Sequence, residues 1–123
     1  MNIVQRAKAN VVIATLRMRC GDAEVFEVLQ SIARTDADFV AKQTAPTVIG
    51  VPASREAEDI VERALEGYIR DRTDGFRRDG ADESATNAYS LAFVLAFHDA
   101  IDEAVAQAIG APAKTPSGLP AIR

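Results

Sequence analysis

The stretch NAYSLAFVLAFHDAIDEAVAQAIG, residues 87–110, decides the fold of this chain. From Asn87 to Phe97 almost every residue is apolar or small, and charged residues begin only after that point. The pattern predicts one long helix over residues 84–109, closed by a glycine and a proline that follow it. A helix that is hydrophobic on nearly all sides in its first half needs protein against more than one face. What covers it, in a chain of 123 residues, is therefore the central question.

Two answers fit this pattern, and both can hold in part. The other elements of the chain can wrap the helix, or one face can pack internally while another packs against a second copy. A large apolar patch left in water is unusual for a monomer, and a symmetric dimer is the commonest way to cover one. We therefore expect a homodimer. The predicted self-association interface consists of Leu91, Val94, Leu95, Phe97 and Ile101.

The first apolar segment, NVVIATLRMR at residues 10–19, is compatible with a strand or a helix. Its β-branched residues and the alternation of apolar and basic residues in LRMR favour a strand over residues 11–18. The helical alternative rests on a three-four spacing of Val4, Ala7, Val11, Ala14 and Met18. A second, short strand is expected at residues 46–52, PTVIGVP, where two prolines bracket a β-branched run.

Helical patterns occupy the segments between these expected strands. Asp22 is a good N-cap for a helix over residues 23–34, and residues 36–42 are its continuation or a short separate helix. Ser54 caps a clear amphipathic helix over residues 55–72. The start of that helix is crowded with acidic residues, which suit the helix dipole. We expect a solvated acidic face there, with a surface for a basic partner or a divalent cation as the alternative; its residues are Glu56, Glu58, Asp59 and Glu62.

The order of these elements predicts a small α/β (or α+β) fold. Residues 1–110 then form a single globular domain with two or three short strands and three main helices, the last of them long and largely buried. Residues 73–82, which contain two glycines, are expected to form a loop, and residues 111–123 an extended or flexible tail. An all-α bundle, in which the first segment is a helix too, is the alternative.

The composition is typical of an ordinary soluble protein. A formal net charge of −4 and a sequence pI near 4.9 give no general reason to expect nucleic-acid binding. No run approaches the roughly 20 apolar residues that a membrane-spanning helix needs, and the first residues lack the layout of a signal peptide. Cys20 is the single cysteine, which excludes an internal disulfide. We expect a cytoplasmic protein without membrane contact.

Few residues are candidates for catalysis. His98 is the only histidine, and Asp102, four residues on, could orient it as a general base. Cys20 precedes a helix N-terminus, where the helix dipole can lower the pKa of a thiol. A histidine and an aspartate at this spacing are more often a pair on the surface of a helix. A cysteine in such a position is more often a small, partly buried residue. Because the chain also lacks the HExxH, GxGxxG and GxxxxGK[ST] motifs, we predict no enzyme, no catalytic residue, no metal site and no cofactor.

An arginine-rich segment at residues 70–78 is the most distinctive polar feature. Arginines with an aromatic residue among them can grip phosphates and stack on a base. Four aspartates in and around the same segment reduce the local positive field, so a self-paired, solvated connection is the competing interpretation. The candidate contacts to RNA or to an acidic protein surface are Arg70, Arg72, Phe76, Arg77 and Arg78.

The order of segments along the whole chain carries a resemblance to a known family. NVVIATLRMR, an acidic helix, PTVIGVP, a second acidic helix, a buried helix and a proline-containing tail follow one another. In this order the chain resembles the assembly and packaging cofactor of double-stranded RNA bacteriophages, the cystoviruses. The resemblance implies a homodimeric α/β fold similar to BRCT modules, and work inside a virion beside the polymerase and the packaging motor. It assigns no catalytic or binding residue.

Together these features predict a non-enzymatic, homodimeric protein-interaction or assembly module. The resemblance adds capsid assembly and RNA packaging, with other proteins of the assembly as partners. The alternative is an RNA-contacting accessory protein that uses the segment at residues 70–78.

Overall fold

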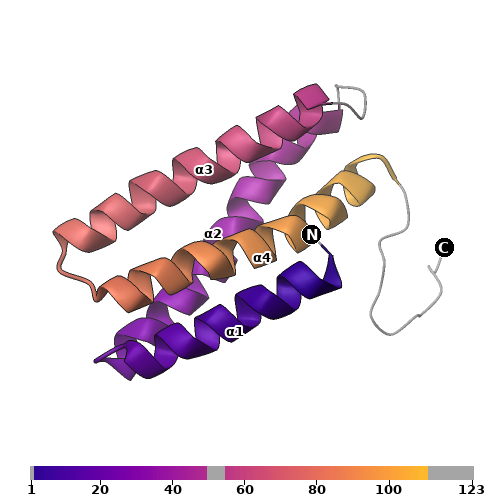
Figure 1. The fold of residues 1–123 in the computed structure, drawn as a ribbon. Helices are drawn as coiled ribbons and strands as arrows, with labels where there is room; N and C mark the ends of the chain where they lie inside the picture. The colour runs from indigo at the N-terminus through magenta and orange to yellow at the C-terminus, as the bar shows by residue number, and fades with distance from the viewer. Residues whose placement is uncertain (1, 50–54, 111–123) are drawn as a thin grey trace.

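The computed structural model describes residues 2–49 and 55–110, and within these ranges every regular element is an α-helix. The four helices are α1 (Ile3–Arg19), α2 (Ala23–Ile49), α3 (Arg55–Arg78) and α4 (Glu83–Ala108). They pack as a bundle (Figure 1). The α/β expectation is therefore wrong, and the all-α alternative describes the fold. The predicted tail at residues 111–123 lies outside the described residues.

Helix α4 is the centre of the bundle, and it contacts α1, α2 and α3. It lies between α1 and α3, with α2 crossing behind them (Figure 1). Between Glu83 and Phe97, only Glu83 and Asn87 are exposed. The helices of the chain itself therefore cover the apolar half of α4, as one of the two sequence-based answers requires.

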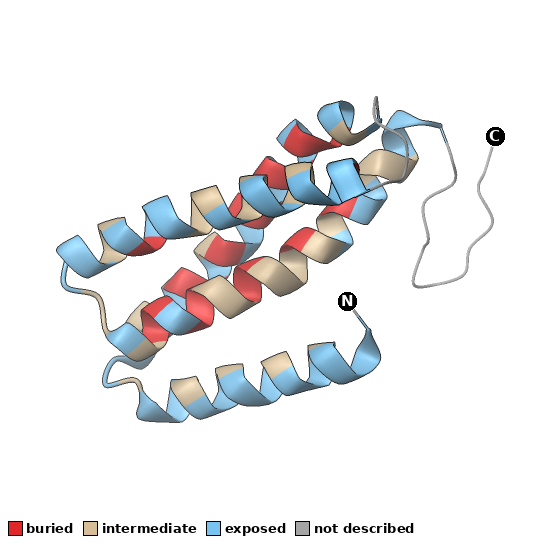
Figure 2. Ribbon diagram, turned by 45° about the horizontal axis from the view of Figure 1, so that its top comes forward, coloured by how far each residue is buried: buried red, intermediate tan, exposed pale blue. Residues whose placement is uncertain are grey.

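Alanines bring α2 and α4 together, and this pair makes the most extensive interhelical contact. Small side chains at three- or four-residue spacing form a low ridge, along which another helix can approach closely. Buried positions gather on these two helices (Figure 2). The buried alanines of the ridge on α2 are Ala33, Ala37, Ala41 and Ala45, and those on α4 are Ala85, Ala88 and Ala92.

The first segment is helix α1 and not the strand expected over residues 11–18. A capping box starts it: the Asn2 side chain accepts from the Gln5 backbone N–H, and the Gln5 side chain accepts from the Asn2 backbone N–H. Arginines in the last turn suit the helix dipole. The β-branched run costs only a few tenths of a kcal/mol per residue in a helix. That penalty is small beside the packing of Ile13 and Leu16 against the core.

The prediction of a second strand at residues 46–52 is also wrong for the residues that the structure describes, because Pro46 to Ile49 form the end of α2. Residues 50–52 lie outside the described residues. Pro46 removes one backbone hydrogen bond near the end of the helix. The burial of Val40, Ala41 and Ala45 immediately before it keeps the helix continuous. The segment at residues 36–42 is thus a continuation of the preceding helix, one of the two forms expected.

The expected loop at residues 73–82 is mostly helical, because α3 continues to Arg78. Gly80, two residues beyond the end of α3, has a φ of 83°, in the left-handed region that favours glycine. The Gly80 N–H donates to the carbonyl of Arg77, and the Ala81 N–H donates to that of Phe76. These two bonds form a Schellman motif. Gly75, the earlier glycine, lies inside the helix and does not end it.

Gln30 is the buried side chain whose substitution should stabilise the protein. Its amide nitrogen is buried on α2 and has no hydrogen-bond partner among the described residues. An unsatisfied buried polar group costs about 1–3 kcal/mol. We expect Gln30→Met, which keeps the length of the side chain, to raise the free energy of unfolding by about 1 kcal/mol.

The matched control is Gln43→Met, because Gln43 is an exposed residue of the same helix. It measures the change in helix propensity alone. Urea unfolding of both variants, with unchanged m-values, gives the comparison. A loss of stability in Gln30→Met that Gln43→Met does not share would contradict the prediction.

Candidate functional site

The segment at residues 70–78 is the last part of α3, and its side chains point in different directions. Arg72 binds Asp36 of α2 through two hydrogen bonds, 2.8 Å from Nε to Oδ2 and 3.1 Å from Nη2 to Oδ1. Phe76 packs edge-on against Tyr89 with ring centroids 5.0 Å apart. The Arg72 guanidinium also lies 5.9 Å from the centre of the Phe76 ring. Two of the five candidate RNA contacts are thus engaged with the interior of the bundle.

Asp36 is the centre of a polar network that joins α2, α3 and α4. Its carboxylate accepts the two bonds from Arg72 and a third, 2.8 Å, from the Tyr89 hydroxyl. Burial alone would raise the pKa of the Asp36 carboxyl, but the hydrogen bonds from Arg72 and Tyr89 outweigh it, and the pKa lies below its usual value. Burial raises the pKa of Tyr89, as does its hydrogen bond to Asp36. This network fixes α3 to the rest of the bundle.

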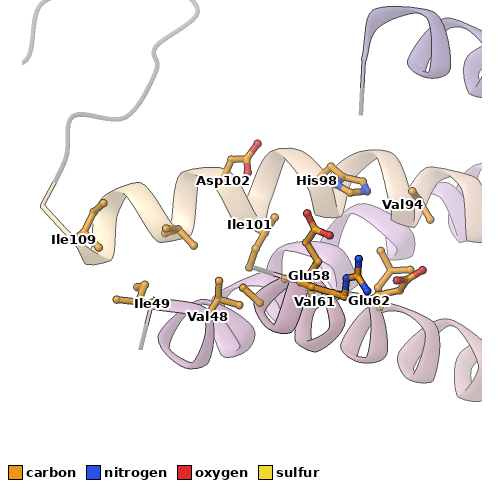
Figure 3. Close-up of a pocket in the computed structure, with 14 residues that line it drawn as sticks. Val48, Ile49, Glu58, Val61, Glu62, Val94, His98, Ile101, Asp102 and Ile109 are labelled. Atoms are coloured by element: carbon orange, nitrogen blue, oxygen red, sulfur yellow. The ribbon is translucent and has the colours of Figure 1, made fainter. Parts of the chain in front are cut away.

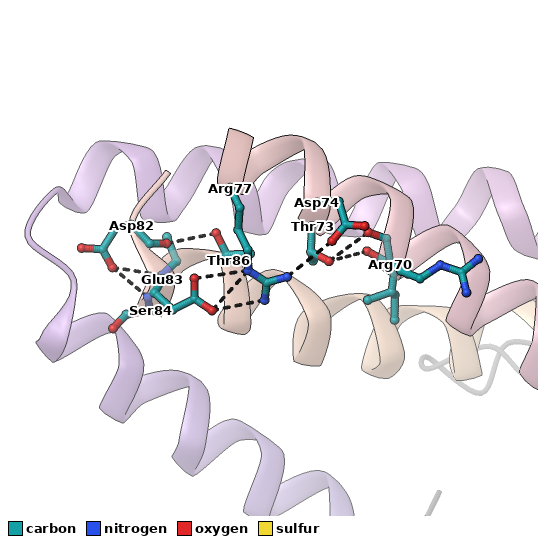
Figure 4. A network of polar contacts seen from close by, with 10 residues as sticks. Arg70, Thr73, Asp74, Arg77, Asp82, Glu83, Ser84 and Thr86 are labelled. Carbon is teal, nitrogen blue, oxygen red and sulfur yellow. Dashed lines mark hydrogen bonds and ion pairs between the residues drawn. The ribbon is translucent and has the colours of Figure 1, made fainter. Parts of the chain in front are cut away.

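Arg77 forms a second, exposed set of contacts at the turn between α3 and α4 (Figure 4). Its guanidinium donates to the Glu83 carboxylate at 3.2–3.3 Å and lies 3.7 Å from that of Asp74. Next to it, Asp82 caps α4 by accepting from the Ser84 N–H at 2.8 Å. That backbone hydrogen bond holds the pKa of Asp82 below its usual value. Arg77 therefore stabilises the turn through neighbouring carboxylates, as the self-paired interpretation of the segment expects.

All four arginines of the set are exposed, but Arg70 and Arg78 form no ion pair with another helix among the described residues. Arg70 lies 3.7 Å from the carboxylate of its neighbour Asp71. The structure does not bring the five candidate residues together on one surface, and the RNA-contact hypothesis stays a prediction. Its test remains the salt dependence of RNA binding by a variant with Arg77→Ala and Arg78→Ala.

The five residues predicted to form a self-interface on α4 lie largely inside the chain. Phe97 and Ile101 are buried, and Phe97 stacks on Phe93 with ring centroids 5.9 Å apart. Leu91, Val94 and Leu95 are partly buried. A second copy would find little of this surface exposed.

A groove of about 1150 Å³ opens between α3 and α4 beside the end of α2 (Figure 3). Apolar side chains from all three helices line it, among them Val48, Val61 and Ile101. In Figure 3 Ile101 points from α4 toward α3, and Glu58 points from α3 toward α4. The other lining residues are Ile49, Arg55, Ala57, Glu62, Leu65, Val94, His98, Asp102, Val105 and Ile109.

His98 lies on the α4 side of this groove, as does Asp102. Burial lowers the pKa of the His98 imidazole, and the partial opposing effect of the Asp102 charge does not reverse it. The two groups share a groove wall, but no hydrogen bond joins them in the described structure. Cys20, the other candidate for chemistry, ends α1, where its thiol donates to the carbonyl of Asp22 at 3.3 Å. No group of three or more His, Cys, Asp or Glu side chains suited to a metal occurs among the described residues.

The outer face of α1, defined as Val4, Ala7, Val11, Ala14 and Met18, is an exposed apolar surface of the bundle. All five residues are exposed, and α1 has no buried residue at all (Figure 2). The inner face is different, because Ile13 and Leu16 pack against the core. Sequence reasoning found the three-four spacing of the outer face but assigned the segment to a strand, and so missed this surface. The capping box at Asn2 and Gln5 was the signal for the helix.

Comparisons with protein families, with curated proteins and with solved structures find no match to this chain. The α/β, BRCT-like fold implied by the resemblance to the cystovirus assembly cofactor does not describe the four-helix structure. None of the helices in residues 2–49 and 55–110 combines the length and the apolar character that crossing a membrane requires.

Proposed function

We propose that this chain is a non-enzymatic protein-interaction module that acts as a homodimer through the outer face of α1. The observation that carries the proposal is the exposure of this face: Val11, at its centre, is 65% exposed. Apolar side chains on both sides of one helix indicate that something packs against each side. Within residues 2–49 and 55–110, the chain packs against the inner side alone.

The spacing of the outer face supports a second copy as its partner. Val4, Val11 and Met18 are seven residues apart, and Ala7 and Ala14 fall between them. This is the heptad pattern of a helix that pairs with another helix. The pattern is also symmetric about Val11, with Val4 and Met18 at equal distances from it. Two antiparallel copies related by a two-fold axis near Val11 would place Val4 against Met18 of the partner.

The charges of α1 are compatible with such pairing. Arg6 forms a bidentate contact with Asp99 of α4, and Arg17 lies 3.0 Å from the Glu27 carboxylate of α2. Two of the basic side chains of α1 are thus neutralised within the chain, and the helix contains no acidic residue. Only modest repulsion between the two copies is expected. The ion pairs also hold α1 in the orientation that exposes its outer face.

The test is the absolute mass in solution, measured by light scattering across a hundredfold dilution. We expect twice the 13.2 kDa of one chain for the native protein, and 13.2 kDa for Val11→Glu. The substitution places two carboxylates against each other at the two-fold axis, where like charges cost several kcal/mol. The dissociation constant should rise at least a hundredfold.

Val28→Glu is the matched control, because Val28 is a half-exposed valine on α2, outside the outer face of α1. This variant should keep the native mass. A native mass of 13.2 kDa at every concentration would overturn the proposal. So would an equal effect of the two substitutions, since the interface would then not lie on α1.

Capsid assembly is one setting for such a module. That part of the proposal rests on the resemblance to the cystovirus cofactor alone, and its partners would be the other proteins of the assembly.

A further inference from the structure

The α3–α4 groove combines an apolar floor with an acidic rim. Nine of its fourteen lining residues are apolar, and they come from α2, α3 and α4. Glu58 and Glu62 on α3 and Asp102 on α4 are exposed at its edges. None of the three carboxylates forms an ion pair with another described residue. The one arginine of the lining is Arg55, so the charge around the groove is net negative.

This combination selects among ligand classes. Unpaired carboxylates repel phosphates, which disfavours nucleotides, nucleic acid and the surface of an anionic membrane. A volume of about 1150 Å³ exceeds the roughly 300–1,000 Å³ of usual small-molecule pockets, and the groove is open as far as the described residues form it. Grooves between helices that are apolar at the base commonly accept the apolar face of an amphipathic helix, whose anchors recur at i, i+3 or i+4, and i+7.

We propose that the α3–α4 groove binds a cationic amphipathic helix from another protein. The apolar side chains of that helix would pack against Val61, Ile101 and Val105, and its lysines or arginines would lie beside Glu58 and Glu62. Complementary charge of this kind favours specificity and fast association. The acidic start of α3, expected from the sequence to be a solvated face, is in this proposal the recognition surface for a basic partner. The proposal does not depend on dimerisation, because the outer face of α1 lines no part of the groove.

The test uses two fluorescent synthetic peptides of about 18 residues, or five helical turns. One has leucine anchors at helical spacing with lysine elsewhere, and the other has the same anchors with glutamate in place of lysine. Fluorescence polarisation should show binding of the lysine peptide and at least tenfold weaker binding of the glutamate peptide. The double variant Glu58→Gln with Glu62→Gln should weaken binding of the lysine peptide about tenfold and reduce its salt dependence.

Glu56→Gln with Glu66→Gln is the matched control, because these residues lie on the same helix and outside the groove. It makes the same change in net charge and should leave the affinity within twofold of the native value. Equal losses in the two double variants would overturn the proposal, since the attraction would then come from the overall charge. Equal binding of the two peptides would also overturn it.

A third peptide tests whether the α3–α4 groove binds a second copy of this chain instead of a helix from another protein. The sequence of α1, residues 3–19, is itself amphipathic and basic without an acidic residue. If this peptide binds the groove more tightly than the lysine peptide does, the occupant is a second copy of the chain, and the proposal of a foreign helix is wrong. Weaker binding of the α1 peptide supports it. The three peptides are compared on Val11→Glu, because the outer face of α1 in the native chain would itself bind the α1 peptide. The affinities of the lysine and glutamate peptides should be the same for this variant as for the native chain.

Discussion

Replacement of Arg72 by methionine is expected to lower the free energy of unfolding by about 3 kcal/mol, or roughly 10 °C in Tm. The reason is the asymmetry of the ion pair: the Asp36 side chain is only 9% exposed, whereas that of Arg72 is 44% exposed. Arg72→Met leaves a buried carboxylate without its cationic partner, and the Tyr89 hydroxyl still donates to it. Asp36→Asn should lower the free energy of unfolding by less than Arg72→Met does, because the Arg72 side chain can reach water when it loses its partner.

The pH dependence of this effect has a definite sign. The pKa of Asp36 in the folded chain is lowered from its usual value, so its contribution to stability is fully present above about pH 4. It is lost as the pH falls through the folded-state pKa. The stability difference between the native protein and Arg72→Met should therefore be large at pH 7 and shrink in strong acid. Denaturant unfolding at both pH values measures it.

Arg70→Met is the control for this experiment. Arg70 is on the same helix and exposed, and among the described residues its side chain pairs with the exposed Asp71. We expect its replacement to change stability by less than about 0.5 kcal/mol. If Arg72→Met costs no more than Arg70→Met, the network around Asp36 does not fix α3 to the bundle.

Phe93→Ala is the second substitution with a large expected effect. The Phe93 ring is fully buried and stacks between Tyr68 of α3 and Phe97 of α4, with centroids 5.6 and 5.9 Å away. Removal of a buried phenylalanine side chain costs about 3–5 kcal/mol. Because a domain of this size has a total stability of only about 5–15 kcal/mol, much of the protein's stability would be lost.

Phe39→Ala makes the same chemical change on α2, where the ring is 53% exposed. It should cost less than about 1 kcal/mol. Thermal and urea unfolding of the two variants give the comparison, and similar losses would contradict the assigned core. If Phe93→Ala does not fold, Phe93→Leu should still lose about 1–2 kcal/mol and allow the measurement.

The helix α4 shows how far the sequence alone determines this structure. Its bounds, its central place and its apolar first half follow from the pattern of residues 84–109, and the structure agrees to within one residue at each end. A helix without a polar face in its first half has to be surrounded by protein. The sequence could not say whether one chain or two provide that protein, because hydrophobic burial has no preferred direction.

The helix α1 shows where local patterns are insufficient. Its β-branched residues favour a strand locally, but a propensity difference of a few tenths of a kcal/mol per residue is easily exceeded by tertiary contacts. The packing of Ile13 and Leu16 on the core decides in favour of the helix. The same packing determines which face of α1 is exposed. The candidate self-interface is therefore on α1, whereas the sequence analysis placed it on α4.

The polar sites depend on tertiary structure to an even greater degree. Sequence alone identified the arginines at residues 70–78 and the acidic start of α3, since both are local clusters of charge. Only the packed bundle brings Arg72 to Asp36, 36 residues away, and Tyr89 to Asp36, 53 residues away. Likewise, Glu58 and Asp102 share one groove only because α3 and α4 pack side by side. The sequence by itself thus determined the acidic and apolar segments and the long helix α4. The tertiary structure decided that the remaining segments are helices, which charges are neutralised inside and which remain for a partner, because burial and pairing depend on distances between residues far apart in the chain.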